Sequence, residues 1–244
     1  MRMKLSVRMK EIIAFVTPGN RVCDVGTDHG FVPIALVSDN ICPSAIAVDV
    51  NQGPLDIARD NVNSAGLSDR IDLRLGDGLN VVKPDETDTV IISGMGGDLI
   101  ASILENADSG FKGTKELILS PQSEVEKVRH KLHDIGYAID TEKIIIDSKK
   151  PYLVIYALPG EESYEYEHEY KYGKYLLDKG DTMLFEYLKD QLVVFMGARN
   201  RISSKISVSK NLDADKIAKL RQSVSEVQVH IDEIMKLLKM YYHI

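Results

Sequence analysis

The sequence predicts an α/β fold, a doubly wound Rossmann-like sheet, followed by an all-α helical hairpin. The first observation behind this prediction is an alternation of short Val, Ile and Leu runs with helix-like stretches up to residue 160. The second is a change to long heptad-patterned segments after Pro159-Gly160. We therefore expect a first domain over 1–160 and a helical accessory domain over 161–244.

Seven apolar runs account for the predicted sheet. Runs of this length, bounded by helix-like segments, are typical of buried parallel strands joined by crossover helices. The last two runs lie too close together for a crossover, so they should form an antiparallel pair. The runs cover residues 21–26, 44–50, 70–78, 87–97, 115–121, 138–146 and 152–159.

Two long helices are predicted from apolar positions that recur at spacings of three and four. Asp213 is placed to cap the second helix. The pattern fits an antiparallel hairpin within one chain, and it fits equally a coiled coil between two chains, so a monomer or a weak dimer is expected. The recurring positions are Leu188, Leu192, Phe195, Arg199, Ile202 and Ile206, then Ile217, Leu220, Val224, Val227, Ile231, Ile234 and Leu238.

Composition narrows the class of protein. With 44% hydrophobic and 27% charged residues, the 244-residue chain is globular, and no apolar stretch approaches a membrane span. The amino terminus lacks the apolar region of a signal peptide, so we expect a cytoplasmic protein without membrane contact. Cys23 and Cys42 are isolated, which indicates buried thiols and no metal site. The net charge of −7 argues against broad affinity for nucleic acid.

The first run ends in a glycine loop that opens a helix. A loop of this kind lets the backbone approach a ligand, and the helix presents unpaired amides there. Asp49 ends the second run about twenty residues later, where a carboxylate can accept hydrogen bonds from ribose hydroxyls. Together they predict a nucleoside-containing cofactor, contacted by Asp24, Gly26, Thr27, His29, Gly30, Asp49 and Val50.

The charge of the glycine loop indicates which nucleoside-containing cofactor it would bind. Asp28 stands where a dinucleotide-binding loop has glycine, and its carboxylate would repel a pyrophosphate. It suits the sulfonium and ammonium groups of S-adenosylmethionine, which we therefore favour over nicotinamide cofactors. Further cofactor contacts are expected at the ends of the third and fourth runs. These are Gly76, Asp77 and Gly78, with Asp77 facing the adenine amine, and Ser93, Gly94 and Met95.

Four segments resemble the bacterial tRNA (adenine-22-N1)-methyltransferase family. They are VCDVGTDHGFVPIAL, AVDVNQGPL, RLGDGL and IISGMGG. The helical hairpin is similar to that family's accessory coiled-coil domain. The chain lacks the Asn/Asp-Pro-Pro-aromatic turn of many base methyltransferases, which argues against methylation of an exocyclic amine. The resemblance implies a class I methyltransferase that uses S-adenosylmethionine, acts on a ring nitrogen of tRNA and has Asp28 as its catalytic residue.

The chemistry of adenine supports a role for Asp28. The N1 lone pair can attack a methyl group without prior deprotonation, and the product is a cationic adenine with a more acidic amino group. A nearby carboxylate could orient that amino group and accept its proton. Asp28 could instead only cap the following helix. His29 is expected to be a loop histidine and not a general base.

Residues that would bind the RNA are predicted from charge and position. Residues 1–10 form an amphipathic helix with a basic outer face, which could contact phosphate or simply be solvated. Basic residues along the first long helix carry the same two interpretations: Arg199, Arg201, Lys205 and Lys210. The Tyr- and Glu-rich segment after residue 160 is expected to pack on the first domain. The predicted substrate contacts are Arg2, Lys4, Arg8, Gly96, Gly97, Lys150 and Tyr152.

Two other functions remain open from the sequence. A methyltransferase could act on another RNA site, a small molecule or a protein, although a small substrate does not need an extended helical arm. An RNA-binding protein without turnover would not require Asp28, Asp49 and Asp77 together.

Overall fold

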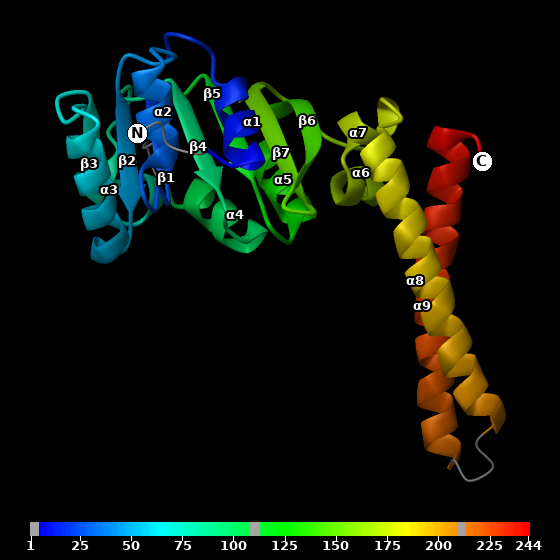
Figure 1. Ribbon diagram of the computed structural model, residues 1–244. Coiled ribbons are helices and arrows are strands. Elements are labelled where there is room, and N and C mark those ends of the chain that lie inside the picture. Colours follow the sequence, from blue (N-terminus) through cyan, green and yellow to red (C-terminus); the bar gives the residue numbers. More distant parts are fainter. Residues whose placement is uncertain (1–4, 108–112, 209–212) are drawn as a thin grey trace. The chain divides into compact units, whose positions relative to one another are not determined.

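The computed structural model describes residues 5–107, 113–208 and 213–244 (Figure 1). The chain forms two compact units, Met1–Tyr175 and Leu176–Ile244. Residues 161–175, which the sequence predicts to open the helical domain, belong to the first unit. The assignment of two separate domains stays a prediction.

A single sheet of seven strands forms the centre of the first unit. All seven apolar runs are strands, in the order β3-β2-β1-β4-β5-β7-β6. The first five are parallel, and β7 is antiparallel to both β5 and β6, which confirms the predicted antiparallel pair. The strands are β1 Val22–Val25, β2 Ala45–Asp49, β3 Ile71–Leu75, β4 Thr89–Ser93, β5 Glu116–Ser120, β6 Tyr137–Asp147 and β7 Lys150–Pro159.

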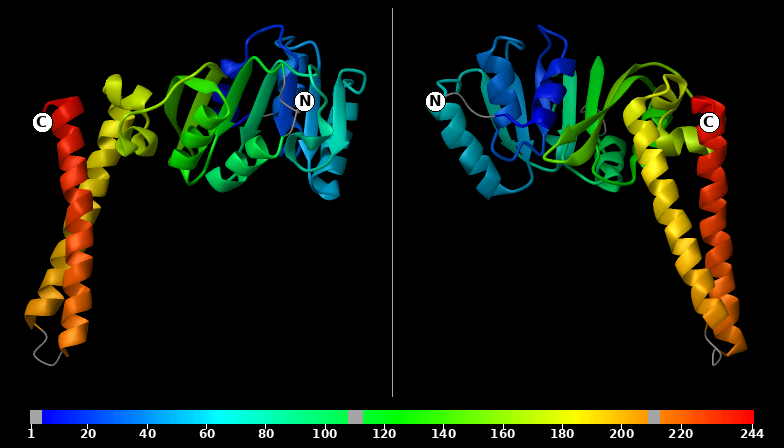
Figure 2. Two further views of the ribbon diagram at one scale, coloured as in Figure 1. Left: turned by 180° about the vertical axis from the view of Figure 1, so that it is seen from behind. Right: turned by 45° about the vertical axis from the view of Figure 1, so that its right-hand side comes forward.

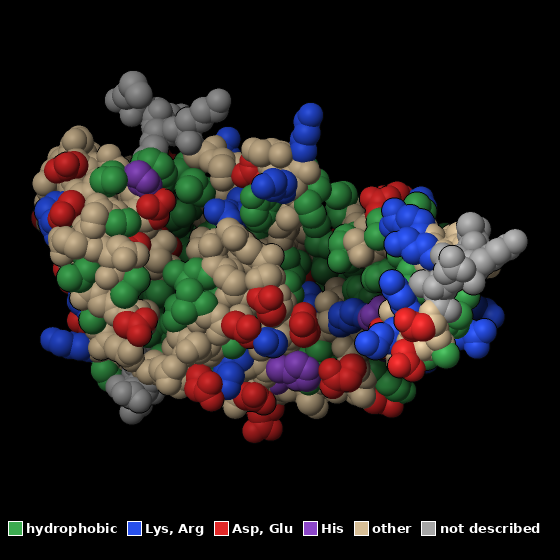
Figure 3. Space-filling view, turned by 90° about the horizontal axis from the view of Figure 1, so that it is seen from below, with side chains coloured by type: hydrophobic (Ala, Val, Ile, Leu, Met, Phe, Trp, Pro, Cys, Tyr) green, Lys and Arg blue, Asp and Glu red, His purple; other side chains and the backbone are tan. Residues whose placement is uncertain are grey.

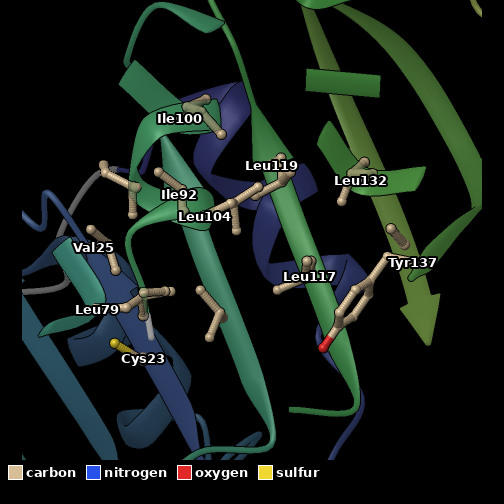
Figure 4. Packing of buried hydrophobic residues seen from close by; sticks show 14 of the residues in the cluster. Cys23, Val25, Leu79, Ile92, Ile100, Leu104, Leu117, Leu119, Leu132 and Tyr137 are labelled. Carbon is tan, nitrogen blue, oxygen red and sulfur yellow. The ribbon is translucent and has the colours of Figure 1, made fainter. Parts of the chain in front are cut away.

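Helices cover both faces of this sheet. Side chains alternate along a strand, so Ile91 and Ile118 pack against the helices on one face of the sheet. The residues next to them in β4 and β5 pack against the helices on the other face. One face is covered by α1 (Val7–Phe15), α2 (Phe31–Ser38) and α3 (Gln52–Ser64). The other is covered by the 3₁₀ helix η1 (Gly78–Val81), α4 (Gly97–Glu105) and α5 (Val125–Asp134). Figure 4 shows the core of this second face, where Ile92 and Leu119 meet Leu104.

The carboxyl ends of the five parallel strands meet at one edge of the sheet. β7 runs in the opposite direction, so its first residue, Lys150, lies at this edge too. The backbone amide of Arg8 donates to the Asp147 carboxylate over 3.1 Å, which brings the start of α1 to the same edge. This edge faces the viewer in Figure 3, where acidic and hydrophobic side chains both reach the surface. It is where ligands bind in open α/β sheets.

The Tyr- and Glu-rich segment packs on the first unit, as predicted. Its helix α6 (Glu167–Tyr172) contacts α5 through the buried guanidinium of Arg129, which donates to the Tyr170 carbonyl over 2.5 Å. Arg129 also pairs with the buried carboxylate of Glu142 at 2.8 Å. His133 bonds to the Tyr170 hydroxyl and to Glu162, both at 3.1 Å. These bonds attach residues 162–170 to α5 and β6.

The second unit is a pair of long helices, α8 (Thr182–Val208) and α9 (Ala214–Tyr242), preceded by α7 (Lys174–Asp178), which spans the division. Figure 2 shows α8 and α9 side by side in both views. They are antiparallel, because Phe195 stacks on His230 and Arg199 donates to Gln228 over 2.8 Å. Asp213 caps α9 as predicted, accepting from the amide of Lys216 at 2.7 Å.

The described residues also bear on the cysteines and on membrane contact. Cys23 and Cys42 are both buried free thiols, which confirms that prediction. Burial raises the pKa of the Cys42 thiol to about 11. Within the part of the chain that is described, no helix combines the length and apolar content of a membrane-spanning helix.

A buried carboxylate at the opposite edge of the sheet should make folding pH-dependent. Glu116 accepts bonds from the Thr17 amide and from the hydroxyls of Thr17, Thr89 and Tyr156, at 2.5 to 3.0 Å. Burial alone would raise its pKa, but these donors outweigh burial and hold the pKa below its ordinary value. Glu116 therefore stabilises the fold above its unfolded pKa of about 4.5, and this contribution is lost on further acidification.

Glu116→Gln should lower the free energy of unfolding by about 1–3 kcal/mol at pH 7, because an amide group replaces one of the two carboxylate oxygens, each of which accepts two of the four bonds. The difference from the native chain should shrink below pH 4. Urea denaturation at pH 7 and pH 3.5 measures both values, with the exposed Glu161→Gln as the matched control. An equal loss at both pH values would contradict the assignment.

Candidate functional site

The glycine loop after β1 lies directly against the end of β2. The amides of Gly26 and Thr27 both donate to the Val48 carbonyl, over 2.8 and 3.0 Å. Gly26 has a φ of +72°. A Cβ added there would overlap the methyl carbon of Met95, which lies in the turn after β4. The positive φ favours glycine here, and a larger residue would have to displace the end of the Met95 side chain. The first and fourth strand ends are therefore in contact, as the sequence predicts for one binding site.

Asp49 joins the glycine loop to the second strand. Its Oδ2 accepts from the backbone amide of Asp28 at 3.2 Å, and its Oδ1 accepts from the amide of Asn51 at 2.9 Å. The residue is buried, with 8% of its surface exposed. Each carboxylate oxygen retains further acceptor capacity. The carboxylate is thus held in one orientation at the edge where ligands bind.

Asp28 presents its carboxylate to solvent. Its side chain is 69% exposed, and its backbone has a left-handed φ of +52°. The N-cap of α2 is Gly30, with no side-chain capping bond, so Asp28 does not cap this helix. His29 lies beside it, with 3.4 Å between Nε2 and Asp28 Oδ1, and stacks on Phe31. The capping alternative is therefore excluded, and the carboxylate is available to a ligand.

Asp24 is buried beneath the loop. Its Oδ2 accepts from the Thr27 hydroxyl at 2.7 Å. Burial raises the pKa of Asp24 to about 6, helped by the charge of Asp49 and opposed by the Thr27 hydrogen bond. Asp24 therefore supports the loop through Thr27 and has little direct access to a ligand.

The turns after β3 and after β2 also lie at this edge of the sheet. The amide of Gly76 donates to the Asp49 carbonyl over 3.0 Å, so the end of β3 adjoins that of β2. Asp77 follows with an exposed side chain, and Gly78 begins η1. Val50 is also exposed here, at 63%.

The turn after β4 is a close backbone contact, as predicted from its glycines. The Gly94 amide donates to Ser120, and the Met95 carbonyl accepts from Gln122 at 2.9 Å. A Cβ added to Gly97 would overlap the carbonyl of Glu124, so only glycine fits there. Ser93 and Gly96 flank these contacts and are half-buried.

Arg8 lies against the same turn. Its guanidinium sits over the ring of Tyr152, 4.9 Å from the centroid, and a Cβ on Gly94 would be 3.6 Å from its Nη2. Its Nη1 is buried and has no hydrogen-bond partner among the described residues. A buried guanidinium nitrogen normally has an acceptor, so a bound molecule could supply it here. The structure thus brings together the predicted residues Arg8, Tyr152 and Gly94.

The remaining predicted contacts fall into two groups. Lys150 is exposed at the start of β7, at this edge of the sheet. Arg2 and Lys4 lie outside the described residues. Gln122 is not among the residues predicted from the sequence, although its side chain also approaches Gly94. Its position just after the end of β5 is the sequence signal that indicates it, because the other predicted contacts also follow strand ends.

The hydrogen-bond acceptors at this edge suit a nucleoside cofactor that carries positive charge. Asp49 offers oriented acceptor oxygens for a ribose, and the exposed Asp28 and Asp77 make the edge acidic. At Gly26, the methyl end of Met95 occupies the space that a side chain would need. Among the described residues, no group of three His, Cys, Asp or Glu side chains could hold a metal ion.

Comparisons with known proteins agree with this geometry. A family model described as a methyltransferase domain matches residues 5–155. The tRNA (adenine(22)-N(1))-methyltransferase of Bacillus subtilis (strain 168) is 35% identical over 165 residues, which cover 68% of this chain and 69% of the relative. The chain belongs to the tRNA (adenine(22)-N(1))-methyltransferase family. The resemblance seen in the sequence is thereby confirmed.

Solved structures of the family share the whole architecture. The B. subtilis tRNA methyltransferase TrmK superposes with a TM-score of 0.82 at 26% identity, over 97% of this chain and 100% of that chain. A putative tRNA methyltransferase of Streptococcus pneumoniae, in complex with S-adenosyl-L-methionine, superposes with a TM-score of 0.76 at 27% identity. That comparison covers 93% of this chain and 100% of the other. The predicted class I methyltransferase fold is confirmed, with its helical C-terminal unit.

Gly26→Ala tests whether the loop is a binding surface of this family member. Alanine should cost about 1 kcal/mol of stability at a positive φ, and it should lower the affinity for S-adenosylmethionine at least about tenfold by displacing Met95. Gly19→Ala is the matched control, because Gly19 also has a positive φ but nothing lies within 4 Å of an added Cβ. Calorimetric titration measures both variants. Equal affinities would exclude the loop from the cofactor site.

Proposed function

We propose that this protein transfers the methyl group of S-adenosylmethionine to N1 of adenine-22 in tRNA. The observation that carries the proposal is the exposed carboxylate of Asp28, whose own backbone amide is held by Asp49, in a loop whose Gly26 adjoins Met95 of the turn after β4. Family membership indicates the substrate class, because the B. subtilis relative is named as a tRNA (adenine(22)-N(1))-methyltransferase. A tRNA substrate places the reaction in the cytoplasm.

The cofactor would be held at four strand ends, those of β1, β2, β3 and β4. Asp49 accepts hydrogen bonds from the ribose hydroxyls, and Asp77 accepts from the adenine amine. The loop residues Gly26 to Gly30 pass around the methionine part, with Val50 and the segment Ser93–Met95 as further contacts. When bound, the cofactor supplies an electrophilic methyl group on a sulfonium. In-line placement of adenine N1 then provides much of the rate enhancement.

Asp28 acts on the target base. As N1 takes the methyl group, the adenine ring becomes cationic and its amino group becomes more acidic. The Asp28 carboxylate accepts a hydrogen bond from that amino group, stabilises the developing charge and takes up the proton. Its high exposure allows a base to reach it, and the base must first leave its stack because N1 is inaccessible in a paired duplex.

Substrate contacts surround this carboxylate. Arg8 offers to an acceptor on the RNA its Nη1, which has no partner among the described residues, and its guanidinium lies over the ring of Tyr152. Lys150 adds charge at the same edge, and the backbone of Gly96 and Gly97 lines the turn. The basic residues Arg2 and Lys4 would extend this contact. The helical unit acts as a coiled-coil arm for the tRNA, in a monomer or a weak dimer.

Methylation of unmodified tRNA tests the proposal directly. The protein is incubated with S-adenosylmethionine and tRNA that carries no modifications, and the nucleosides are identified by mass spectrometry. We expect 1-methyladenosine. A different methylated nucleoside would overturn the assignment of N1, and cofactor binding without any methylation would move the substrate to a small molecule or a protein.

Asp28→Ala should lower the rate of methyl transfer at least about a thousandfold while the affinity for S-adenosylmethionine stays within about tenfold, because Asp28 acts mainly in the transition state. The Asp28 amide that bonds to Asp49 is retained in this variant. Single-turnover kinetics and calorimetric titration measure the two quantities. If the affinity for S-adenosylmethionine falls by much more than tenfold, Asp28 is a cofactor ligand, and its assignment as the catalytic residue is wrong.

Arg8→Gln should raise KM for tRNA at least about tenfold and leave the affinity for S-adenosylmethionine within about twofold, because a charge-assisted contact to the RNA is lost. Lys10→Gln is the control, since Lys10 is exposed on the same helix and carries the same charge. Steady-state kinetics with varied tRNA separates KM from kcat. A fall in cofactor affinity would assign Arg8 to the cofactor.

A further inference from the structure

The turn after β5 places a glutamine beside the turn after β4. The backbone amide of Gln122 donates to the Met95 carbonyl over 2.9 Å, and the amide of Gly94 donates to the Ser120 carbonyl over 3.1 Å. These two bonds join the turns through backbone atoms alone. The Gln122 side chain is exposed and takes no part in them. Replacing this side chain therefore leaves the contact between the turns intact.

The Gln122 carboxamide borders the side of Gly94 on which other residues carry a Cβ. A Cβ added to Gly94 would be 3.8 Å from Nε2 of Gln122 and 3.6 Å from Nη2 of Arg8. The φ of Gly94 is +82°, a conformation that favours glycine, so its backbone is left bare here. Among the described residues, none bonds to the carboxamide, and none bonds to Nη1 of Arg8. Two groups with unused hydrogen-bonding capacity thus flank one glycine.

Gln122 and Asp28 lie on opposite sides of the turn after β4. In the sheet, β4 pairs with β1 on one side and with β5 on the other. Asp28 follows the end of β1, and Gln122 follows the end of β5. Because neighbouring strands are about 4.8 Å apart, the ends of β1 and β5 are separated by about 10 Å. A base that lies over the turn after β4 therefore has a carboxylate on one side and a carboxamide on the other.

The two hydrogens of the adenine amino group point in different directions. One points to the side of N1, where the proposed function places the Asp28 carboxylate. The other points to the side of N7, so that this edge of adenine presents a donor next to an acceptor. A carboxamide presents an acceptor next to a donor. The Gln122 side chain is therefore complementary to the edge of adenine that methyl transfer leaves free.

We propose that Gln122 selects adenine as the target base. Its Oε1 accepts from the amino group and its Nε2 donates to N7. Guanine carries acceptors at both positions, so Oε1 would face an acceptor whichever way the carboxamide is turned. The proposal rests on the proposed function, which supplies the adenine and the role of Asp28, and it adds the residue that distinguishes this base from guanine.

A change of one atom in the substrate, combined with a change of one side chain, tests the contact to N7. Two tRNA transcripts carry adenine or 7-deazaadenine at position 22; the analogue keeps N1 and the amino group but has carbon in place of N7. Each is methylated by the native protein, by Gln122→Ala and by the control Ser123→Ala. Ser123 is exposed in the same turn, and its hydroxyl bonds to the Glu124 carboxylate. Affinity for S-adenosylmethionine is measured in parallel and should be unchanged.

The loss caused by the analogue should depend on Gln122. In the native protein and in Ser123→Ala, removing N7 should lower kcat/KM about tenfold, because a hydrogen bond to the base is lost. Gln122→Ala should be about tenfold slower than the native protein on adenine, and it should lose less than about twofold more on the analogue. The analogue also differs in the basicity of N1, but this difference affects all three proteins alike and cancels in the comparison.

Gln122→Glu adds a result that a purely structural role would not produce. The carboxylate has the same size and can accept from the amino group, but it repels the lone pair of N7. Relative to Gln122→Ala, this variant should therefore prefer 7-deazaadenine over adenine by about tenfold. A side chain that only shapes the turn would change the rates on both transcripts by the same factor.

The failure of this inference is distinguishable from failure of the proposed function. If removing N7 lowers kcat/KM equally in the native protein and in Gln122→Ala, Gln122 does not contact N7 and the inference is overturned. Formation of 1-methyladenosine by the native protein would still support the proposed function in that case. If the native protein forms no 1-methyladenosine on the adenine transcript, both are overturned.

Discussion

The two hydrogen bonds of the Asp49 carboxylate are the constraint on which the candidate site depends. One oxygen holds the amide of Asp28 and the other holds the amide of Asn51, so one buried side chain ties the glycine loop to the end of β2. The left-handed backbone at Asp28 and the helix start at Gly30 follow from the path of this loop. Because Asp28 is restrained through its backbone, its carboxylate remains exposed, and its partner among the described residues is His29. The Asp28 carboxylate can therefore contact a substrate base without first breaking a hydrogen bond within the protein.

The buried Asp24 carboxyl beneath the glycine loop lowers the stability of the fold at neutral pH. Burial raises the pKa of Asp24 to about 6, whereas hydrogen bonds hold the pKa of Glu116 below its ordinary value at the opposite edge. A carboxyl group with a raised pKa destabilises the folded state at neutral pH, and this cost diminishes as the pH falls from about 6 toward the ordinary value of 3.8. Glu116 behaves in the opposite sense.

Much of this organisation follows from local sequence patterns. The seven strands are predicted by apolar runs, and the glycine loop and Asp49 by their order along the chain, because these features depend on neighbours in sequence. The contacts that complete the site depend on residues far apart. The position of Arg8 against Tyr152 and Gly94 requires α1 to reach the antiparallel end of the sheet, which no spacing reveals. The attachment of residues 162–170 through Arg129 and Glu142 is equally non-local, and it places this segment in the first unit.

The most direct measurement compares two tRNA transcripts that differ only at position 22, one with adenine and one with guanine. Each is incubated with the protein and S-adenosylmethionine, and the methylated nucleosides are located by mass spectrometry of ribonuclease fragments. The account predicts 1-methyladenosine at position 22 of the first transcript and no methylation of the second. Equal methylation of both transcripts, or methylation at another position, would contradict it.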